Sequence, residues 1–493
     1  MNGSRKIVAL VLLGVLALAL RVCVVIVLSS EHDGPLAYEH GQIAENLLAG
    51  RGFSIEYLGG EGPTSQQAPF YPVMLAAVYS VFGTATPESV LAVQLLQCVV
   101  GTALVLAVAW LGWSLAPDRP SVGVIAGLGA AVYPTHVYMV THLQVAIWAA
   151  LLLTLLLAVV TSRTLTATRR GAVLAGCLSG ILLLVEPILA LAIPICAIAF
   201  WLSEGAITWR ARFTRSAAGH LILMAGIAAV IIAPWTVRNW AVHGQPVFIK
   251  SSFGYAFWQG NNPASHGTDK IPKPSVDDLL REHDGTLAGM DRALWEARHE
   301  TLYIDDVLLT DEDYAQMGAL SEPERSKVLG RRAWKFVSAE PVKYAGLCLQ
   351  RLRYFLLFDE TNPKASNRLY RMSTVSWLVL VSIGLVVSRS HWRRLWPTYT
   401  IFAAVTIFHV LVIVSVRFRI PIEPLSFIWA ASAIAPVVVG LLSYRPIKVH
   451  RPGQQARDPF ANEHVLRGPH YKPKQAARGE GKAALGEGRG AKG

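Results

Sequence analysis

Charged residues are scarce in this chain of 493 residues: Asp, Glu, Lys and Arg make up 16% of it, whereas hydrophobic residues make up 53%. The mean hydropathy is +0.40. Soluble domains carry about 25% charged residues, so this composition excludes an ordinary soluble protein. Apolar runs near the length of a bilayer span recur along the chain, which predicts an all-α polytopic membrane protein.

Cysteine is also scarce, and the spacing of the five cysteines excludes a metal site made of them. All lie in apolar stretches, so we interpret them as small buried hydrophobic residues. No internal repeat is evident, which disfavours the secondary-transporter folds that are built from repeats. The first apolar run lacks a small-residue cleavage site and is interrupted by Arg21, so we expect it to remain as the first span.

The apolar runs predict about ten transmembrane helices. Single spans are expected near residues 7–29, 90–116, 121–134, 141–160, 218–236, 373–388, 397–415 and 421–443. The stretch 171–203 is interrupted by Glu186 and Pro187, so it is expected to form a hairpin of two short spans.

Basic residues gather in short segments, which are expected on the cytoplasmic side. These residues are Arg5, Lys6, Arg163, Arg169, Arg170, Arg210, Arg212, Arg215, Arg389, Arg393 and Arg394. Span parity then puts residues 30–89 and 237–372 outside. This assignment requires residues 343–358 to lie along the outer interface, which Arg351 and Arg353 within that stretch favour.

The predicted organisation has four parts. Residues 1–236 form an N-terminal transmembrane module with a first outer catalytic loop at 30–89. Residues 237–342 form a small extracytoplasmic α or α+β region, and 343–443 an interfacial helix with the remaining spans. Much of the formal net charge of +12 lies in residues 444–493, which are rich in Gly, Pro, Lys and Arg. We expect a disordered cytoplasmic tail against anionic membrane lipids, with a nucleic-acid arm as the weaker alternative.

The first outer loop predicts two amphipathic interfacial helices. One follows Pro35 and ends at Gly50, and the other runs from Pro69 to Gly83. The apolar face of the first consists of Ile43, Ala44, Leu47 and Leu48. Glu39 falls in its first turn, where the positive helix end favours an ionised carboxylate that can accept a proton or a cation. The alternative is that Glu39 only compensates the helix dipole.

Three arginines are expected at the outer face: Arg238 in "PWTVRN" and the pair Arg417 and Arg419 in "VRFRIP". A guanidinium can bind phosphate oxygens in pairs. Pro421 biases the residue before it away from helix, so "RFRI" is predicted to be extended, with both arginines on one side. The alternative is that these arginines only anchor the spans at the membrane boundary.

The outer region contains a Gly-, Asn- and Pro-rich loop, "WQGNNPASHGT", at residues 258–268. It is a candidate to close over a sugar, with Trp258 as a stacking face and Asn261 and Asn262 as hydroxyl partners. A plain cluster of turns is the equal alternative.

An Asp-x-Asp pattern at Asp311 and Asp313 is a candidate divalent-metal site. Thr310 with Asp313 also matches a capping box, and acidic residues suit a first helical turn. We favour capping and therefore predict no metal site.

Four segments in order resemble the GT-C superfamily of membrane glycosyltransferases. They are "YEHGQIAENLLAGRGFS", "GPTSQQAPFYPVMLAAVYSVFG", "APWTVRNWAVHGQPVFIKSSFGYAFWQGNNP" and "VRFRIPIEP". The resemblance extends over residues 1–443. It is strongest to bacterial glycosyltransferase family 39 proteins, relatives of the protein O-mannosyltransferases and of the lipid A aminoarabinose transferases.

This resemblance implies an inverting hexosyl- or pentosyltransferase of the bacterial inner membrane, without a cofactor. It implies a polyprenyl-phosphate sugar donor, an acceptor that is a glycan, lipid or protein, and chemistry on the extracytoplasmic face. The family's acidic base matches Glu39, with Asp33 as the other candidate. The departing phosphate needs positive charge, for which Arg417, Arg419 and Arg238 are the candidates.

The sequence departs from the family at three places. Gln67, Ala68 and Pro69 replace a Lys-Pro-Pro whose lysine lies near the lipid phosphate. Glu186, in "LVEP", stands where an arginine is usual. Ala146 lies about where a second acidic residue is often found, and the polar groups there are His136, His142 and Gln144. These departures leave the acceptor and the phosphate-binding residues open.

Two other classes remain as alternatives. A transporter or flippase for a lipid-linked glycan needs charged residues deep within its spans, and the few candidates, Arg21 and Glu186, lie near span ends. A non-catalytic assembly protein does not require the outer carboxylate at all.

Overall fold

The computed structural model describes residues 3–28, 37–166, 168–202 and 215–443 of the chain. The described residues are mainly helical, with two short two-stranded sheets, β1–β2 and β3–β4. They form one compact unit up to Ser443. The predicted class, an all-α polytopic membrane protein with a small additional region, is confirmed. The predicted tail at 444–493 lies outside the described residues.

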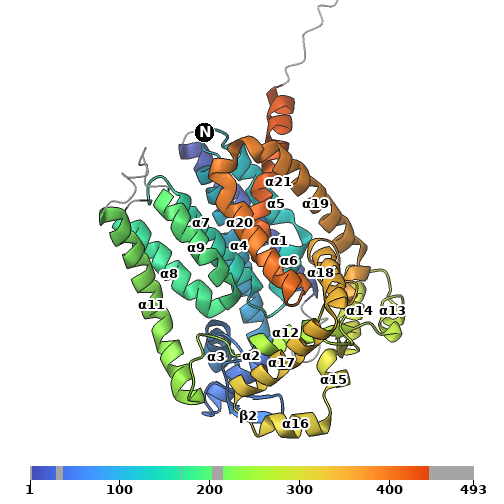
Figure 1. Cartoon of the computed structure of the whole chain (residues 1–493). Helices are drawn as coiled ribbons and strands as arrows, with labels where there is room; N and C mark the ends of the chain where they lie inside the picture. The colour runs from blue at the N-terminus through green and yellow to red at the C-terminus, as the bar shows by residue number, and fades with distance from the viewer. Residues whose placement is uncertain (1–2, 29–36, 167, 203–214, 444–493) are drawn as a thin grey trace, which may run out of the picture. The chain divides into compact units, whose positions relative to one another are not determined.

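Long apolar helices make up one end of the molecule, the upper part of Figure 1. They are α1 (Gly3–Leu28), α4 (Pro87–Leu115), α5 (Ser121–Val132), α7 (Ala146–Thr161), α8 (Arg169–Val185), α9 (Ala192–Leu202), α11 (Arg215–His243), α19 (Arg368–Ser388), α20 (Trp392–Leu411) and α21 (Glu423–Ser443). Each predicted span corresponds to one of these helices. Short turns of helix join them: α6 (Pro134–Tyr138), η2 (Met139–Thr141), η3 (Pro187–Leu191), η4 (Pro363–Ser366), η5 (Arg389–His391) and η6 (Val416–Phe418).

By length and composition, five stretches of helix among the described residues can cross a membrane, or six if the bent pair 121–132 and 134–141 is one span. The helices at 146–161 and 187–202 are apolar but shorter. Large apolar side chains such as Ile7 and Leu12 of α1 are more than 60% exposed (64% and 65%). Such a surface suits contact with lipid. The count of about ten spans stays a prediction.

Small residues set the close packing of α8 on α11. A Cβ on Gly176 would lie 2.7 Å from the carbonyl oxygen of Met224, and one on Gly180 would lie 2.8 Å from the Cβ of Ile231. This small-xxx-small spacing lets two membrane helices approach closely. In Figure 1, α8 and α11 lie side by side at the green edge of the bundle.

The cation within the first span, Arg21, is part of the bundle's packing. Its side chain is fully buried, and its Nη atoms donate hydrogen bonds to the carbonyls of Ala17, Ala130 and Ala131 at 3.1–3.3 Å. The guanidinium thus satisfies carbonyls at the end of α5, which have no partner within that helix. These contacts give Arg21 a structural role and do not favour the transporter alternative.

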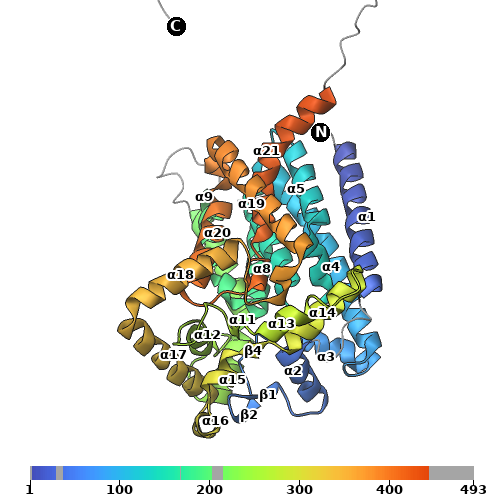
Figure 2. The same cartoon turned by 90° about the vertical axis from the view of Figure 1, so that its right-hand side faces the viewer.

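The opposite end of the molecule, the lower half of Figure 1 and Figure 2, holds a layer of shorter elements, which we call the outer layer after its predicted side of the membrane. It contains α2 (Tyr38–Leu48), β1 (Ser54–Tyr57), β2 (Gly60–Pro63), α3 (Phe70–Phe82), α12 (Phe253–Gly260), β3 (Lys270–Ile271), α13 (Pro274–Leu279), α14 (Leu287–His299), β4 (Leu302–Tyr303), α15 (Ile304–Leu308), α16 (Asp311–Gly318), α17 (Glu322–Ala339) and α18 (Pro341–Leu356). The two helices expected in the first outer loop are confirmed as α2 and α3. The expected helix start near Pro35 lies outside the described residues.

A tight hairpin that the sequence analysis did not anticipate follows α2. β1 and β2 pair antiparallel, with Tyr57 opposite Gly60, and the two turn residues Leu58 and Gly59 have φ of 50° and 77°. Two positive φ values match the turn type that suits two-residue hairpins. A Cβ on Gly59 would lie 2.2 Å from the carbonyl oxygen of Tyr314, so glycine also lets α16 approach the hairpin.

Candidate active site

The short helix η6, between α20 and α21, places the charge of Arg417 within electrostatic range of several segments of the chain. The charge of Arg417 acts on titratable groups that are far apart in sequence. They are Tyr38 and His40 of α2, Glu186 before η3, Lys250 after α11, Asp269 before β3 and Lys364 of η4. A cluster of titratable side chains from separate elements is a common property of functional sites. We call this cluster the candidate active site.

Arg417 is exposed, and its guanidinium forms no hydrogen bond or ion pair with any residue that the structure describes. Its one recorded contact is with the ring of Phe418, whose centroid lies 5.4 Å from the guanidinium carbon. Arg419, two residues later, is only 2% exposed. Its Nε donates to Glu423 Oε1 at 2.6 Å, and its Nη1 donates to the carbonyls of Phe355 and Leu356.

The prediction that both arginines project from an extended "RFRI" segment is wrong. Residues 416–418 form a 3-10 helix and Arg419 has α-type dihedral angles, φ −78° and ψ −30°. The proline at 421 restricts only the residue before it, whereas the segment gains turn hydrogen bonds such as Ile420 N to Arg417 O, at 3.3 Å. Because of this turn, Arg417 stays exposed at the cluster, whereas Arg419 is buried in the protein interior.

Arg238 is occupied by structural contacts. Its Nη1 donates to the carbonyl of Thr64 at 2.6 Å, and its Nη2 donates to the carbonyl of Phe53 at 2.9 Å. The guanidinium also lies 4.8 Å from the ring centroid of Trp235. Arg238 thus ties the β1–β2 hairpin to α11. Of the three predicted phosphate-binding arginines, Arg417 is the one whose donors face the cluster without a partner in the described chain.

Glu39 lies in the first turn of α2, as predicted, and its side chain is exposed. Its two neighbours each bury a polar atom that has no hydrogen-bond partner within the described residues: Tyr38 Oη and His40 Nδ1. Such unpaired buried atoms are uncommon in native proteins and need an explanation, of which a missing ligand is one. Asp33, the other predicted base, lies outside the described residues.

The backbone beside Glu39 is strained. Tyr38 has φ of 45°, in the left-handed region that costs an ordinary side chain about 1–3 kcal/mol. Burial lowers the pKa of His40 to about 3, with the charges of Lys250 and Arg417 adding to the effect. His40 is therefore neutral at physiological pH.

Lys250 belongs to the site, although the sequence analysis did not single it out. Its Nζ donates to Gln67 Oε1 at 3.0 Å, and its charge interacts with those of Glu186, Arg417 and Glu39. Burial is the main cause that lowers the pKa of Lys250, and the two carboxylates oppose the shift. The available sequence signal was its place inside the third resembling segment.

Lys250 also interacts with two of the positions at which the sequence departs from the family it resembles. Its ammonium bonds to the position where relatives carry a lysine, now Gln67, and interacts with the glutamate that stands where an arginine is usual, Glu186. Only the folded chain brings these three residues together.

A second carboxylate near Glu39 was also missed from the sequence. Asp305 of α15 accepts hydrogen bonds from the hydroxyl of Tyr255 and, at 3.0 Å, from Gln259 Nε2. Burial raises the pKa of Asp305. Glu39 and Asp305 both act electrostatically on Tyr255.

The loop expected to close over a sugar is a packed helix end. Trp258 is 4% exposed within a hydrophobic core. Asn261 Nδ2 donates to the carbonyls of Phe257 and Val412, while its Oδ1 accepts from Arg351 at 2.7 Å. Asn262 Nδ2 donates to the carbonyl of Trp258 at 2.9 Å. The alternative interpretation, a cluster of turns, accounts for these residues.

The segment after the bend at Pro134 forms another wall of the site. His142 Nε2 lies 3.3 Å from Lys364 Nζ, and the His142 ring is 4.8 Å from that of Tyr138. Gln144 is half-buried nearby in sequence, and Ala146 begins α7. His136 is used elsewhere, because its Nε2 lies 2.9 Å from Glu423 Oε2 in the buried network of Arg419.

The capping interpretation of the Asp-x-Asp pattern is confirmed. Thr310 Oγ1 accepts from the backbone N–H of Asp313, and Asp313 Oδ2 accepts from the N–H of Thr310, both at 3.2 Å. Arg332 completes the contact with Asp313 at 2.5 Å. Among the residues that the structure describes, no group of three or more His, Cys, Asp or Glu side chains is arranged to hold a metal ion.

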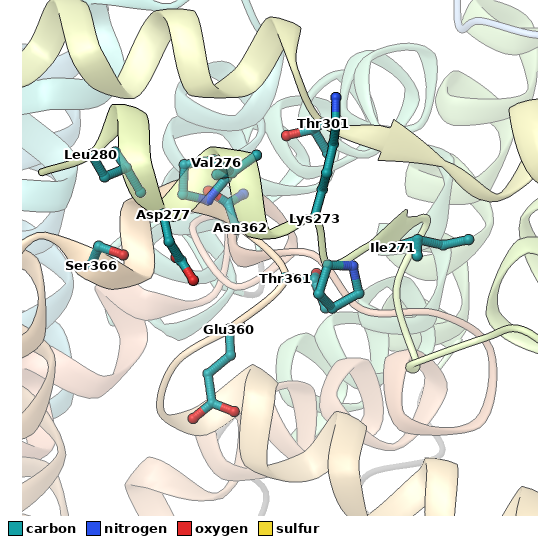
Figure 3. A pocket seen from close by; sticks show the side chains of 12 residues that line it. Ile271, Lys273, Val276, Asp277, Leu280, Thr301, Glu360, Thr361, Asn362 and Ser366 are labelled. Carbon is teal, nitrogen blue, oxygen red and sulfur yellow. The ribbon is translucent and has the colours of Figure 1, made fainter. Parts of the chain in front are cut away.

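A separate cavity of about 230 Å³ opens on the outer layer between α13 and the loop before η4. Figure 3 shows Asp277, Glu360 and Asn362 among the side chains around it. Neither Glu39 nor Arg417 lines this cavity. It is therefore distinct from the candidate active site.

No family model matches this sequence, and no curated protein matches it. Its fold does match solved structures. The oligosaccharyltransferase of Archaeoglobus fulgidus in the apo form superposes with a TM-score of 0.51 at 15% identity, over 89% of this chain and 51% of that one. The same organism's oligosaccharyltransferase AglB, in complex with an inhibitory peptide and a dolichol-phosphate, gives 0.52 at 15% identity, over 92% and 52%.

A bacterial protein also aligns: ArnT from Cupriavidus metallidurans bound to undecaprenyl phosphate, with a TM-score of 0.38 at 14% identity, over 88% of this chain and 78% of that one. That likeness is too loose to support the fold by itself. This chain spans about half the length of the archaeal proteins it matches. The chain shares its fold with the archaeal oligosaccharyltransferase, and the low identity limits the conclusion to the fold.

Proposed function

We propose that this chain is a membrane glycosyltransferase that moves a sugar from a polyprenyl-phosphate donor to an acceptor on the outer face of a bacterial inner membrane. The observation that carries the proposal is the convergence of Glu39, Lys250 and Arg417. The carboxylate of Glu39 and the guanidinium of Arg417 both act electrostatically on Lys250, and the described chain gives Arg417 no partner of its own. A solved structure that shares the fold, AglB of Archaeoglobus fulgidus, is in complex with a dolichol-phosphate, which supports the class of donor.

The chemistry needs one base and one anion site. Glu39 takes the proton of the acceptor's hydroxyl group as that oxygen attacks the anomeric carbon of the sugar. The bond between the anomeric carbon and the phosphate oxygen breaks, and the polyprenyl phosphate leaves with both bonding electrons. Arg417 and Lys250 stabilise the negative charge on that phosphate. A single displacement of this kind inverts the anomeric configuration.

The test uses the purified full chain, a panel of polyprenyl-phosphate sugars and a mixture of glycan, lipid and peptide acceptors. We expect release of polyprenyl phosphate to fall by about a hundredfold or more in Glu39→Gln, because the base is lost while side-chain size is kept. Glu56→Gln is the matched control, since Glu56 is an exposed glutamate of the same outer loop. Equal release by Glu39→Gln and the control would remove Glu39 from the mechanism.

A further inference from the structure

A second group of cations, contributed by α14 and η4, lies within electrostatic range of Arg417. Lys364 Nζ is 3.3 Å from His142 Nε2 and 4.6 Å from the ring centroid of Tyr138. The guanidinium carbon of Arg298 is 4.5 Å from the ring centroid of Tyr38. Within the described residues, neither cation has a carboxylate oxygen in ion-pair contact. Their near neighbours are aromatic rings and one imidazole.

Like charges dominate the surroundings of Lys364. Three cations, Arg298, Lys270 and Arg417, disfavour its charged form, whereas one carboxylate, Asp291, favours it. Lys270 has its own partner, Asp269 Oδ1 at 3.3 Å. Asp291 is already bonded, because it accepts a 2.5 Å hydrogen bond from the hydroxyl of Tyr138.

Holding Lys364, Arg298 and Arg417 close together costs free energy in the unliganded protein. Like charges repel, and a partly buried pair is screened less than an exposed one. No hydrogen bond within the described chain requires Arg298 or Arg417 to be at this place. Burial and these neighbours lower the pKa of Lys364 to about 7. An anion bound between the cations offsets the repulsion and restores the charge of Lys364.

We propose that Arg298 and Lys364 form a second anion site, which holds a phosphate or carboxylate group of the acceptor. The assignment to the acceptor rests on the proposed function, in which Arg417 and Lys250 hold the donor phosphate. Arg298 covers Tyr38, the residue directly before Glu39. An acceptor anchored there by its anionic group has its hydroxyl group beside the base. The acceptor class is therefore a negatively charged glycan, lipid or peptide that also carries a hydroxyl.

The experiment measures binding of methyl phosphate to the detergent-solubilised full chain by titration calorimetry, with undecaprenyl phosphate present in excess. We expect wild-type protein to bind methyl phosphate, and Lys364→Met to bind at least tenfold more weakly. Lys335→Met is the control, because Lys335 is an exposed lysine of α17 outside the site. Arg298→Met is expected to match Lys364→Met. Arg298→Lys keeps a charge above Tyr38 and is expected to weaken binding less.

Two results would overturn the second site. One is equal affinity for methyl phosphate in wild type, Lys364→Met and Arg298→Met proteins. The other is loss of methyl phosphate binding when undecaprenyl phosphate is added, which would mean that a single site takes both. Failure of the proposed function gives a different result: undecaprenyl phosphate itself would bind equally to wild type, Lys250→Met and Arg417→Met proteins. The methyl phosphate titration can then be repeated without undecaprenyl phosphate.

The source of the anion is separated by lipid composition. The titration is repeated in nanodiscs of phosphatidylcholine, with and without phosphatidylglycerol. Weaker methyl phosphate binding in the presence of phosphatidylglycerol supports the site with a lipid head group as its natural ligand. Unchanged binding supports the site with an anion carried by a glycan or peptide.

Discussion

The cations at the two ends of this molecule differ in their hydrogen bonding. In the helix bundle, Arg21 donates three hydrogen bonds to carbonyls of two helices, and Arg419 is bonded to Glu423 and two carbonyls. In the outer cluster, Arg417 and Arg298 have no hydrogen-bond partner within the described chain, and their recorded contacts are aromatic rings. A cation removed from water is costly unless it is paired. The bundle cations therefore hold the fold, whereas we propose that the outer cations bind an external anion.

The largest expected effect tests this contrast at two arginines of one short segment. Arg419→Met removes the partner of Glu423, which stays buried beside His136. We expect the free energy of unfolding to fall by about 3–5 kcal/mol. Arg417→Met has no such partner to leave behind, and its effect should stay within about 0.5 kcal/mol. Thermal unfolding of both proteins in detergent measures the difference. Equal destabilisation would break the comparison.

The next effect concerns the donor. Arg417→Lys keeps the charge but loses the planar pair of donors, so we expect a loss of about 1–3 kcal/mol in binding of undecaprenyl phosphate. Arg417→Ala should lose more than Arg417→Lys. Calorimetric titration with undecaprenyl phosphate measures both. Unchanged affinity in the alanine variant would make Arg417 a membrane anchor.

The same titration with undecaprenyl phosphate tests the role of Lys250. Lys250→Gln should weaken binding of undecaprenyl phosphate about tenfold, or about 1.4 kcal/mol. Adding Gln67→Lys puts a lysine at the position where relatives carry it, and its ammonium faces the same space, since Lys250 Nζ and Gln67 Oε1 are 3.0 Å apart. We therefore expect the double variant Gln67→Lys, Lys250→Gln to recover most of the affinity. A double variant as weak as Lys250→Gln would show that Lys250 does not serve the phosphate.

A pH profile tests the second anion site. Lys364 has a pKa lowered to about 7, so it is charged below pH 7 and increasingly neutral above it. Anion affinity should therefore fall by up to about tenfold per pH unit above pH 7. Methyl sulfate is the suitable probe, because its own charge is constant. The charged and titratable groups around Lys364 are Arg298, Lys270, Arg417, Asp291, His142 and Tyr138. The Lys364→Met protein should lose this fall of anion affinity above pH 7. A fall that persists would belong to another of these groups.

The smallest effect concerns metal. Because Thr310 and the two neighbouring aspartates form a helix cap, Asp311→Asn with Asp313→Asn should cost about 1 kcal/mol of stability and leave transfer unchanged. We also expect transfer to survive EDTA, since arginine and lysine supply the positive charge. Loss of activity in EDTA, restored by manganese or magnesium, would replace the proposed phosphate-binding mechanism.

Much of the fold was predictable because its signals are local. Hydropathy placed each helix of the bundle, and Glu186 with Pro187 marked the break between α8 and η3. The amphipathic stretch after Tyr38 and the cap at Thr310 are likewise patterns of neighbouring residues. The β1–β2 hairpin was missed, because its turn places a leucine, Leu58, at positive φ, where Gly, Asn or Asp is the usual signal.

The site was predictable only in part. Glu39 and Arg417 were named from the sequence, and the structure brings both into the cluster around Lys250. Arg238, Arg419, Trp258, Asn261 and Asn262 were named with them, and the fold commits each to packing or to structural hydrogen bonds. Nothing in a single arginine or asparagine distinguishes the two outcomes, because they depend on which distant backbone carbonyl lies within reach.

The sequence by itself determined that this is a helical membrane protein, where its helices lie and which short segment carries an acidic helix start, because hydropathy and capping act between residues close in the chain. Only the tertiary structure decided which cations are satisfied and which are left for a ligand. The packing of α2, α11, α14, η4 and η6 brings Lys250, Lys364 and Arg298 within electrostatic range of Arg417. Electrostatic interaction depends on distance in space, and the chain's order carries little information about it.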